Sequence, residues 1–434
     1  MSNKREITGW AMYDWANSAF SVTIITLFLG PYLSHLIEIS SGETLNFLGY
    51  PIYKGSFFLY CISISVGLQV LILPILGTLA DYTNLKKPLM LTFAYTGAIA
   101  TILLGIIDGN IVLLGGLLFI IANLCFGAAL VLYNAFLPDI APTDEHDAVS
   151  SKGFAYGYIG SSILLAVNLV MVTFMTDKWL AIRISISSAG VWWLVFTALF
   201  PHRRLIQREP LNKLPANTNY LTHGISEFVA SLKEMRLKYP LTLQFLIGYL
   251  IYNDGIQTVI STASTFGTDE LKIDGSTLAL VILMVQFVAA IGAMGCTYVA
   301  ARIGAKYTVM TTLLIWSGLL IYAYFLMYDA SDIWAWAFVV ALVLGSSQAL
   351  SRSMFAKMIP KSREASYFSL YEISERGTSW LGPIVVAFTQ DQTHSTRLSI
   401  LPMIAFFLMG IVILYFTNVR QAIAEAGNEV PAVV

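Results

Sequence analysis

The chain has 434 residues and a formal net charge of −1, with 57% apolar and 12% charged residues. A soluble domain carries about 45–50% apolar and about 25% charged residues, so this composition is that of an integral membrane protein. The near-zero net charge excludes the basic surface that nucleic-acid binding requires.

The predicted elements are long apolar segments. A membrane-spanning helix needs about 20 mostly apolar residues, and by that measure the sequence predicts an all-α membrane protein with twelve transmembrane helices. Polar residues dilute the first, seventh and eleventh spans, as expected of helices that line a cavity. In chain order the expected spans are residues 8–36, 56–80, 88–107, 111–136, 154–176, 179–200, 240–264, 276–301, 307–327, 332–356, 366–389 and 396–418.

The loops between these spans predict the topology. With both termini placed in the cytoplasm, most of the 25 lysine and arginine residues fall in cytoplasmic loops, as the positive-inside rule requires. The longest loop separates two halves of six spans each. We therefore expect an N-terminal bundle over residues 1–200, a linker over 201–239, a C-terminal bundle over 240–418 and a cytoplasmic tail over 419–434.

The linker is expected to contain an amphipathic helix, because apolar residues recur in it at helical spacing. We expect this helix to lie at the cytoplasmic membrane surface, although a helix that docks a partner has the same pattern. The apolar stripe consists of Leu221, Ile225, Phe228, Leu232 and Met235.

The sequence indicates neither a cofactor nor a catalytic centre. Cys61, Cys125 and Cys296 stand singly inside apolar segments, without the clusters that form disulfide frameworks or zinc sites. No phosphate-binding glycine loop and no nucleophile elbow is present, so neither ATP-driven transport by this chain alone nor an enzyme is indicated. The first apolar segment is too long for a signal peptide and is expected to remain as a span.

The segment between spans two and three carries the first motif. Gly77, Asp81, Lys86 and Lys87 match the glycine, acid and basic pair of the signature loop of the major facilitator superfamily, which the chain therefore resembles. Asn84 replaces a second glycine there and suits a left-handed turn. A six-plus-six repeat predicts a second copy of this loop in the other half, and residues 297–306 provide it. This copy keeps the basic residues and a glycine but lacks the acid.

The resemblance implies that this loop is a gate latch. We expect Asp81 to face the positive N-terminus of the eleventh span, with Lys86 and Lys87 paired to acids there when the inner side is closed. Glu372, Glu375 and Arg376 lie in the first turns of that span. The alternatives are a solvated loop acid at Asp81 and a proton-relay role for the two glutamates.

Three further stretches resemble a narrower group. They are residues 9–20 (GWAMYDWANSAF), residues 133–141 (YNAFLPDIA) and residues 348–383, which include SRSMFAKMIP. Together with residues 252–258 (YNDGIQT), they are similar to the major facilitators that comprise the autophagy-linked vacuolar amino-acid effluxers and their bacterial relatives. This resemblance implies efflux of neutral or branched amino acids.

Polar residues within the spans are the candidates for substrate binding or coupling, because ionisable groups inside a membrane are costly. Asp254 is the first choice for recognising an ammonium group or for carrying a proton, and Asp14 is expected nearer the cytoplasmic gate. The alternative for Asp254 is an acid that only packs helices together. The full set is Asp14, Asn17, Asn123, Tyr133, Asn134, Tyr252, Asn253, Asp254, Gln257, Gln286 and Gln348.

The predicted function is secondary active transport by alternating access. We expect a monomer that exports small neutral amino acids, driven by a substrate gradient or by protons. Its partners are then the substrate, protons and the lipid bilayer, and its place in a bacterium would be the inner membrane. The rival functions are transport of another solute class, such as sugars, lipids or organic cations, and a non-transporting sensor on the same fold.

Overall fold

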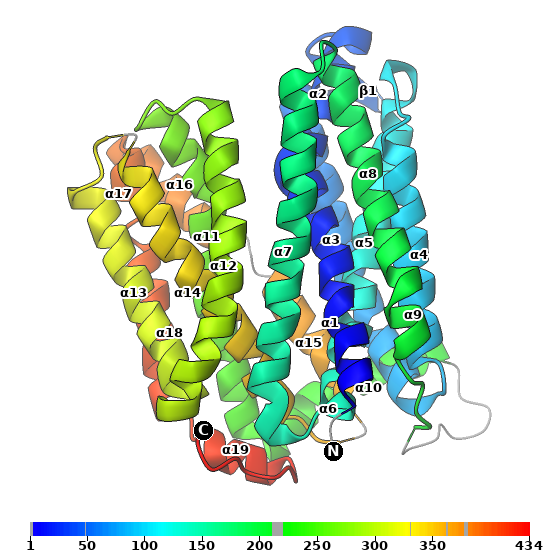
Figure 1. Cartoon of the computed structure of the whole chain (residues 1–434), viewed down its shortest axis with the longest axis vertical. Helices are drawn as coiled ribbons and strands as arrows, with labels where there is room; N and C mark the ends of the chain where they lie inside the picture. The colour runs from blue at the N-terminus through cyan, green and yellow to red at the C-terminus, as the bar shows by residue number, and fades with distance from the viewer. Residues whose placement is uncertain (1–2, 48, 211–219, 330, 362, 377–380) are drawn as a thin grey trace. The chain divides into compact units, whose positions relative to one another are not determined.

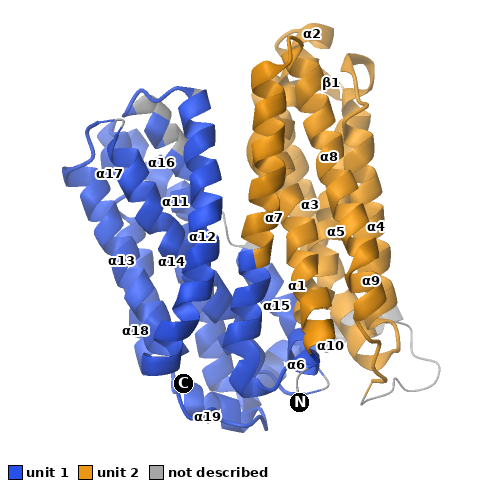
Figure 2. Cartoon of the chain, in the orientation of Figure 1, with its two compact units in different colours: residues 1–3, 135–155, 226–434 blue, residues 4–134, 156–225 orange. Residues whose placement is uncertain are grey.

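The computed structural model describes residues 3–47, 49–210, 220–329, 331–361, 363–376 and 381–434 (Figure 1). It forms two compact units, each a helix bundle (Figure 2). The N-terminal unit holds residues 4–134 and 156–225, and the C-terminal unit holds residues 1–3, 135–155 and 226–434.

The N-terminal unit consists of long apolar helices that are joined by short polar turns. A small antiparallel hairpin, β1 (Thr44–Phe47) and β2 (Tyr50–Tyr53), folds the segment between the first two spans. Its helices are α1 (Lys4–Ala19), η1 (Phe20–Phe28), α2 (Leu29–Ser41), α3 (Lys54–Tyr82), α4 (Lys86–Leu104), η2 (Gly109–Ile111), α5 (Val112–Asn134), most of α7 (His146–Phe174), α8 (Lys178–Leu199), α9 (Pro201–Arg204) and the first turns of α10 (Tyr220–Lys238).

The first span is continuous from α1 to α2 but changes its winding in the middle. Residues Phe20–Phe28 form a π-helix, in which hydrogen bonds run five residues back instead of four. Four polar or ionisable residues of α1 and η1, namely Glu6, Asp14, Asn17 and Thr23, are buried. The polar dilution of this span therefore has a structural counterpart, since its polar groups face protein.

The C-terminal unit repeats this architecture. Asp274 caps the N-terminus of α12 by accepting a hydrogen bond from the backbone N–H of Thr277 at 3.0 Å. Its helices are α6 (Leu137–Ile140), η3 (Thr143–Glu145), the start of α7, the rest of α10, α11 (Pro240–Asp269), α12 (Gly275–Ile303), α13 (Ala305–Phe325), α14 (Asp332–Lys357), α15 (Glu364–Arg376), α16 (Leu381–Thr393), α17 (Thr396–Ser399), α18 (Met403–Phe416) and α19 (Val419–Glu425).

The two units share one pattern of helix pairing. In the N-terminal unit α3 packs on α5, α4 on both α5 and α8, and α1 on α8. In the C-terminal unit α12 packs on α14, α13 on both α14 and α18, and α11 on α18. Counted along the chain, these are the same pairs in each half. The internal repeat inferred from two short loops is thus present in the packing of the whole bundle.

Ten helical stretches of the described chain are long and apolar enough to cross a membrane. The expected spans missing from these ten are the seventh, which is α11, and the eleventh, which corresponds to α15 and α16 around residues 377–380 outside the described chain. The all-α membrane fold is confirmed. The count of twelve spans remains a prediction.

The signature segment differs from the expectation in its local form. Gly77 and Asp81 belong to the last turns of α3, and α4 begins at Lys86, so only residues 83–85 connect the two helices. Asn84 does not take the left-handed conformation, so that interpretation was wrong. In the corresponding segment of the C-terminal half, Gly304 has φ of 89°.

The beginning of the linker is tied to the N-terminal bundle. Arg208 donates from both terminal nitrogens to the buried carboxylate of Glu6, each at 2.9 Å, and the backbone N–H of Ile206 donates to the same group at 3.1 Å. Gln207 accepts from the backbone N–H of Lys87 at 2.7 Å. The expected helix of the linker is α10, and its apolar residues Leu221, Ile225 and Phe228 have side chains outside the described structure.

Candidate transport site and gate

In the N-terminal unit, Asp14 belongs to a buried aromatic cluster. The Tyr133 hydroxyl donates to Oδ2 of Asp14 at 2.7 Å. The Tyr133 ring stacks on Trp10 with centroids 4.4 Å apart, and the Trp10 indole N–H donates to the backbone carbonyl of Tyr133 at 2.8 Å. The structure therefore joins two predicted residues, one on α1 and one on α5.

A second polar contact in this unit ties α3 to α5. The Asn123 side chain donates to the Ser65 hydroxyl at 2.7 Å, and Gln69 donates to the Asn123 carbonyl at 2.8 Å. Asn17 is buried as well, and its amide nitrogen has no hydrogen-bond partner among the described residues. Asn123 thus contributes to packing within the bundle, whereas Asn17 retains an unused donor.

In the C-terminal unit, Asp254 lies in α11 and is 1% exposed. Its Oδ2 accepts a hydrogen bond of 2.8 Å from the backbone N–H of Gly382, the second residue of α16. A carboxylate is well placed there, since the N-terminus of a helix carries partial positive charge. Its other oxygen, Oδ1, is buried and has no hydrogen-bond partner within the described chain.

The other predicted residues of this unit have separate surroundings. The Tyr252 hydroxyl is 2.6 Å from that of Ser351 and so links α11 to α14. Asn253 is buried, and its amide nitrogen has no partner among the residues described. Gln257, Gln286 and Gln348 are half-buried. Asn134, which belongs to the N-terminal unit, is buried at the end of α5.

The predicted gate residues are largely buried. Gly77, Asp81 and Lys86 lie in the N-terminal unit, together with the half-buried Lys87. In the C-terminal unit Glu372 is buried, and Glu375 accepts a hydrogen bond from the Tyr249 hydroxyl at 3.1 Å. The side chain of Arg376 lies outside the described structure. The pairing of Asp81, Lys86 and Lys87 with the eleventh span stays a prediction.

A buried ionic cluster that was not predicted lies between α7 and α14. Lys357 is 3% exposed and pairs with Asp147 at 2.8 Å, and Ser353 donates to the same carboxylate at 2.5 Å. Arg352 donates to the hydroxyl and the backbone carbonyl of Ser150 at 2.9 and 2.8 Å. We call these five residues the α7–α14 lock.

The lock fastens a segment of the first half to the second half, because residues 135–155 pack within the C-terminal unit. The Ser150 hydroxyl also donates to the carbonyl of Ala349 at 2.8 Å, and the Arg352 guanidinium lies 4.1 Å from the centre of the Phe154 ring. The sequence does contain a signal for this cluster, because two cationic residues lie close together at the end of a long apolar helix. The motif SRSMFAKMIP contains both of them.

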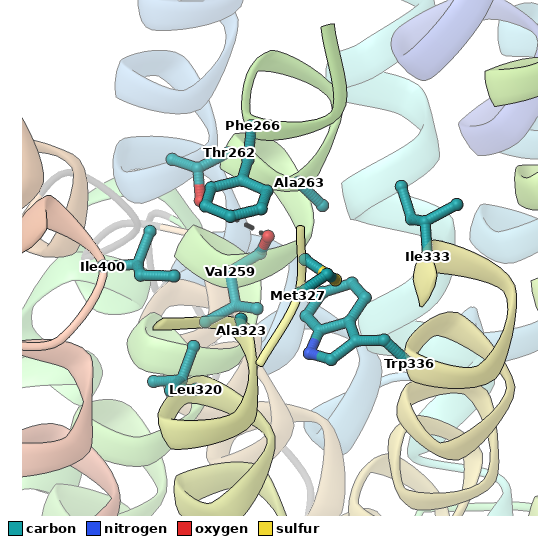
Figure 3. A pocket seen from close by; sticks show the side chains of 10 residues that line it. All are labelled: Val259, Thr262, Ala263, Phe266, Leu320, Ala323, Met327, Ile333, Trp336 and Ile400. Carbon is teal, nitrogen blue, oxygen red and sulfur yellow. Dashed lines mark hydrogen bonds between the residues drawn. The ribbon is translucent and has the colours of Figure 1, made fainter. Parts of the chain in front are cut away.

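A small cavity in the C-terminal unit lies between α11, α13, α14 and the segment after α17 (Figure 3). Its one hydroxyl, that of Thr262, already donates to the carbonyl of Thr258 at 2.7 Å. The cavity therefore offers no free polar group to a charged or zwitterionic solute. Its lining consists of Val259, Thr262, Ala263, Phe266, Leu320, Ala323, Met327, Ile333, Trp336 and Ile400.

Comparison with known proteins decides the family. The family model described as "Vacuole effluxer Atg22 like" matches residues 2–427. The chain belongs to the Atg22-like family of major facilitator transporters. It is 30% identical to the uncharacterized MFS-type transporter YxiO of Bacillus subtilis, over 98% of each chain. It is 25% identical to autophagy-related protein 22-1 of Penicillium rubens, over 91% of this chain and 87% of that one.

Solved structures support the same fold for this Atg22-like chain. The Escherichia coli fucose:proton symporter FucP aligns with a TM-score of 0.70 at 13% identity, covering 95% of this chain and 98% of that one. A bacterial homologue of the iron transporter ferroportin aligns with a TM-score of 0.65 at 11% identity, over 95% and 98%. At such low identity the likeness establishes the major facilitator fold alone.

Proposed function

We propose that this Atg22-like transporter exports small neutral amino acids and couples the export to the proton gradient through Asp254. The observation that carries the direction of transport is the match of nearly the whole chain to a family described as vacuole effluxers. The amino-acid substrate rests on the resemblance of residues 9–20, 133–141 and 348–383 to the vacuolar amino-acid effluxers.

The charges of the chain support a substrate without net charge. In the described part of the C-terminal unit, the buried cations Arg352 and Lys357 are already engaged by α7, and Asp254 faces the N-terminus of α16. A neutral amino acid presents one carboxylate and one ammonium group, which amides and hydroxyls satisfy as donors and acceptors. In the C-terminal unit, Asn253 supplies an amide donor that is not otherwise used among the described residues.

Proton coupling is supported by the position of Asp254. An ionised carboxylate buried inside a membrane protein is costly unless a counter-charge accompanies it, and no ion pair of the described chain includes Asp254. A bound proton removes that cost, and its release restores the charge once in each transport cycle. Asp14 differs, because its carboxylate accepts the Tyr133 hydroxyl in the N-terminal unit.

A ligand screen tests the substrate class. A solute that binds the folded protein raises its apparent melting temperature. The increase grows with the ratio of the solute concentration to its Kd. We expect neutral amino acids to raise the melting temperature of the purified protein in detergent, and sugars, lipids and organic cations to leave it unchanged. A shift produced only by one of those other classes would contradict the proposal.

A further inference from the structure

The contact between α11 and α16 contains two buried oxygens that lack a donor. One is Oδ1 of Asp254 and the other is the hydroxyl of Thr258, one helical turn further along α11. Both residues are 1% exposed. A buried acceptor without a partner costs about 1–3 kcal/mol, so a pair of them on one helix face needs an explanation.

Gly382 lies against both residues. Its backbone N–H donates to Oδ2 of Asp254, and a Cβ atom added to it would come within 2.0 Å of the Thr258 hydroxyl oxygen. Only a glycine allows this approach. Gly382 thus contacts both the Asp254 carboxylate and the Thr258 hydroxyl at the start of α16.

The behaviour of Thr258 is unusual beside that of its neighbour. A threonine inside a helix commonly donates to the carbonyl four residues earlier, as Thr262 does to Thr258 at 2.7 Å. Thr258 makes no such bond in the described structure, although the carbonyl of Asp254 is the one available. Its hydroxyl oxygen is therefore free to serve as a ligand or an acceptor.

The charge of this site selects its ligand. α18, which packs along α11, has no acidic or basic residue, and the ionisable side chains of α14, α15 and α16 include Arg352, Lys357, Glu372, Glu375 and Asp391. Within the described chain, none of these and no residue of another helix packed on α11 forms an ion pair with Asp254. The Asp254 carboxylate carries one negative charge, the Thr258 hydroxyl is neutral, and the N-terminus of α16 carries only partial positive charge. A ligand with a single positive charge therefore neutralises the site.

We propose that Asp254 and Thr258 form a binding site for a monovalent cation, either a proton or Na⁺, and that Gly382 couples this site to α16. A proton on Oδ1 is donated to the Thr258 hydroxyl, and Na⁺ takes both oxygens as ligands. In either case the bound cation neutralises the carboxylate and weakens its attraction for the N-terminus of α16. The inference deepens the proposed function by naming where the coupling ion binds.

The test measures cation binding to the full-length protein in detergent, without any amino acid. The melting temperature is recorded in NaCl against choline chloride at constant pH, and separately across pH 5 to 8 in choline chloride. Because other carboxyls also titrate, the quantity compared is the difference between wild type and Asp254→Asn. Dependence on Na⁺ identifies a sodium site, and dependence on pH alone identifies a proton site.

Three threonine variants complete the test. Thr258→Val keeps the shape of the side chain but lacks the ligand oxygen, so we expect a loss of about tenfold in apparent cation affinity. Thr258→Ser should retain the wild-type response. Thr262→Val is the matched control, since its hydroxyl is already bonded to Thr258.

The site would be refuted if wild type, Asp254→Asn and Thr258→Val responded alike to Na⁺ and to pH. The proposed substrate can fail separately. If no amino acid is transported while the cation response still depends on Asp254 and Thr258, the amino-acid proposal falls and the cation site stands.

Discussion

At the scale of single residues, the hydrogen bond from Tyr133 to Asp14 is the clearest link between the first and fourth spans. Tyr133→Phe removes the donor and leaves a buried carboxylate oxygen without it, so we expect a loss of about 1–3 kcal/mol in the free energy of unfolding. Tyr13→Phe is the control, because the buried Tyr13 hydroxyl has no hydrogen-bond partner among the described residues. Equal losses of stability in thermal unfolding of the two variants would contradict this role of Tyr133.

The α7–α14 lock makes a second prediction at this scale. Asp147→Asn leaves the buried Lys357 ammonium without its counter-charge, which should destabilise the protein by about 3 kcal/mol. Lys238→Ala removes an exposed pair with Glu234 and should cost under about 0.5 kcal/mol. The melting temperatures of the two variants provide the measurement, and an Asp147→Asn variant as stable as Lys238→Ala would rule out a buried ion pair.

Single residues also show how far the sequence can be interpreted. Asp14 and Asp254 are identifiable because an acid inside an apolar segment is rare, and both prove to be buried. Their partners are not identifiable, since Tyr133 and Gly382 lie more than a hundred positions away along the chain. The two acids have different contacts: Asp14 accepts a hydrogen bond from a phenol, and Asp254 accepts one from the start of a helix.

At the scale of elements, close approach between helices depends on individual glycines. A Cβ atom on Gly292 would come within 2.3 Å of the backbone carbonyl of Leu342 on α14, whereas one on Gly295 would meet nothing within 4 Å. Gly292→Ala should therefore push α12 from α14 and cost about 1–3 kcal/mol. Gly295→Ala should be neutral or stabilise α12 by up to about 1 kcal/mol. If both variants melted at the same temperature, close packing of α12 on α14 would not depend on Gly292.

The C-terminal end of α14 depends on a side chain near the end of the chain. The Asn428 amide donates to the carbonyls of Lys357 and Ile359 at 2.9 and 2.8 Å, so it satisfies groups that the end of a helix leaves free. Asn428→Ala should cost about 1–2 kcal/mol and speed amide hydrogen exchange in residues 355–361. Gln421→Ala is the matched control, because within the described structure that side-chain amide donates to the Glu425 side chain and not to backbone carbonyls at the end of a helix. Unchanged exchange in Asn428→Ala would exclude this capping role.

Helical elements are well predicted where apolar runs are long and poorly predicted where short polar motifs decide the geometry. The continuous span from Lys4 to Ser41 follows from its hydropathy, but the π-helical stretch within it has no periodic signal. The signature segment shows the same limit. Its residues identify the superfamily. The left-handed turn predicted at Asn84 was wrong, because an asparagine at a glycine position of the motif does not by itself require positive φ.

At the scale of the whole molecule, the two halves repeat one set of helix pairs, which the sequence revealed only through two short loops. The segment from 135 to 155 departs from that division, since it packs with the C-terminal unit. Composition and hydropathy do not predict that residues 135–155 pack against the other half of the chain. Asp147 and Ser150 of this segment bind the buried cations Lys357 and Arg352 of α14, and these contacts hold the segment there.

The central claim is that the transporter moves neutral amino acids against protons through Asp254. The most direct measurement is accumulation of labelled neutral amino acids by proteoliposomes with an acidic interior, comparing wild type with Asp254→Asn. Wild type should accumulate the label until the pH gradient is collapsed, and Asp254→Asn should lose this accumulation while it remains folded. Accumulation by Asp254→Asn equal to that of wild type, with the same dependence on the pH gradient, would contradict the account.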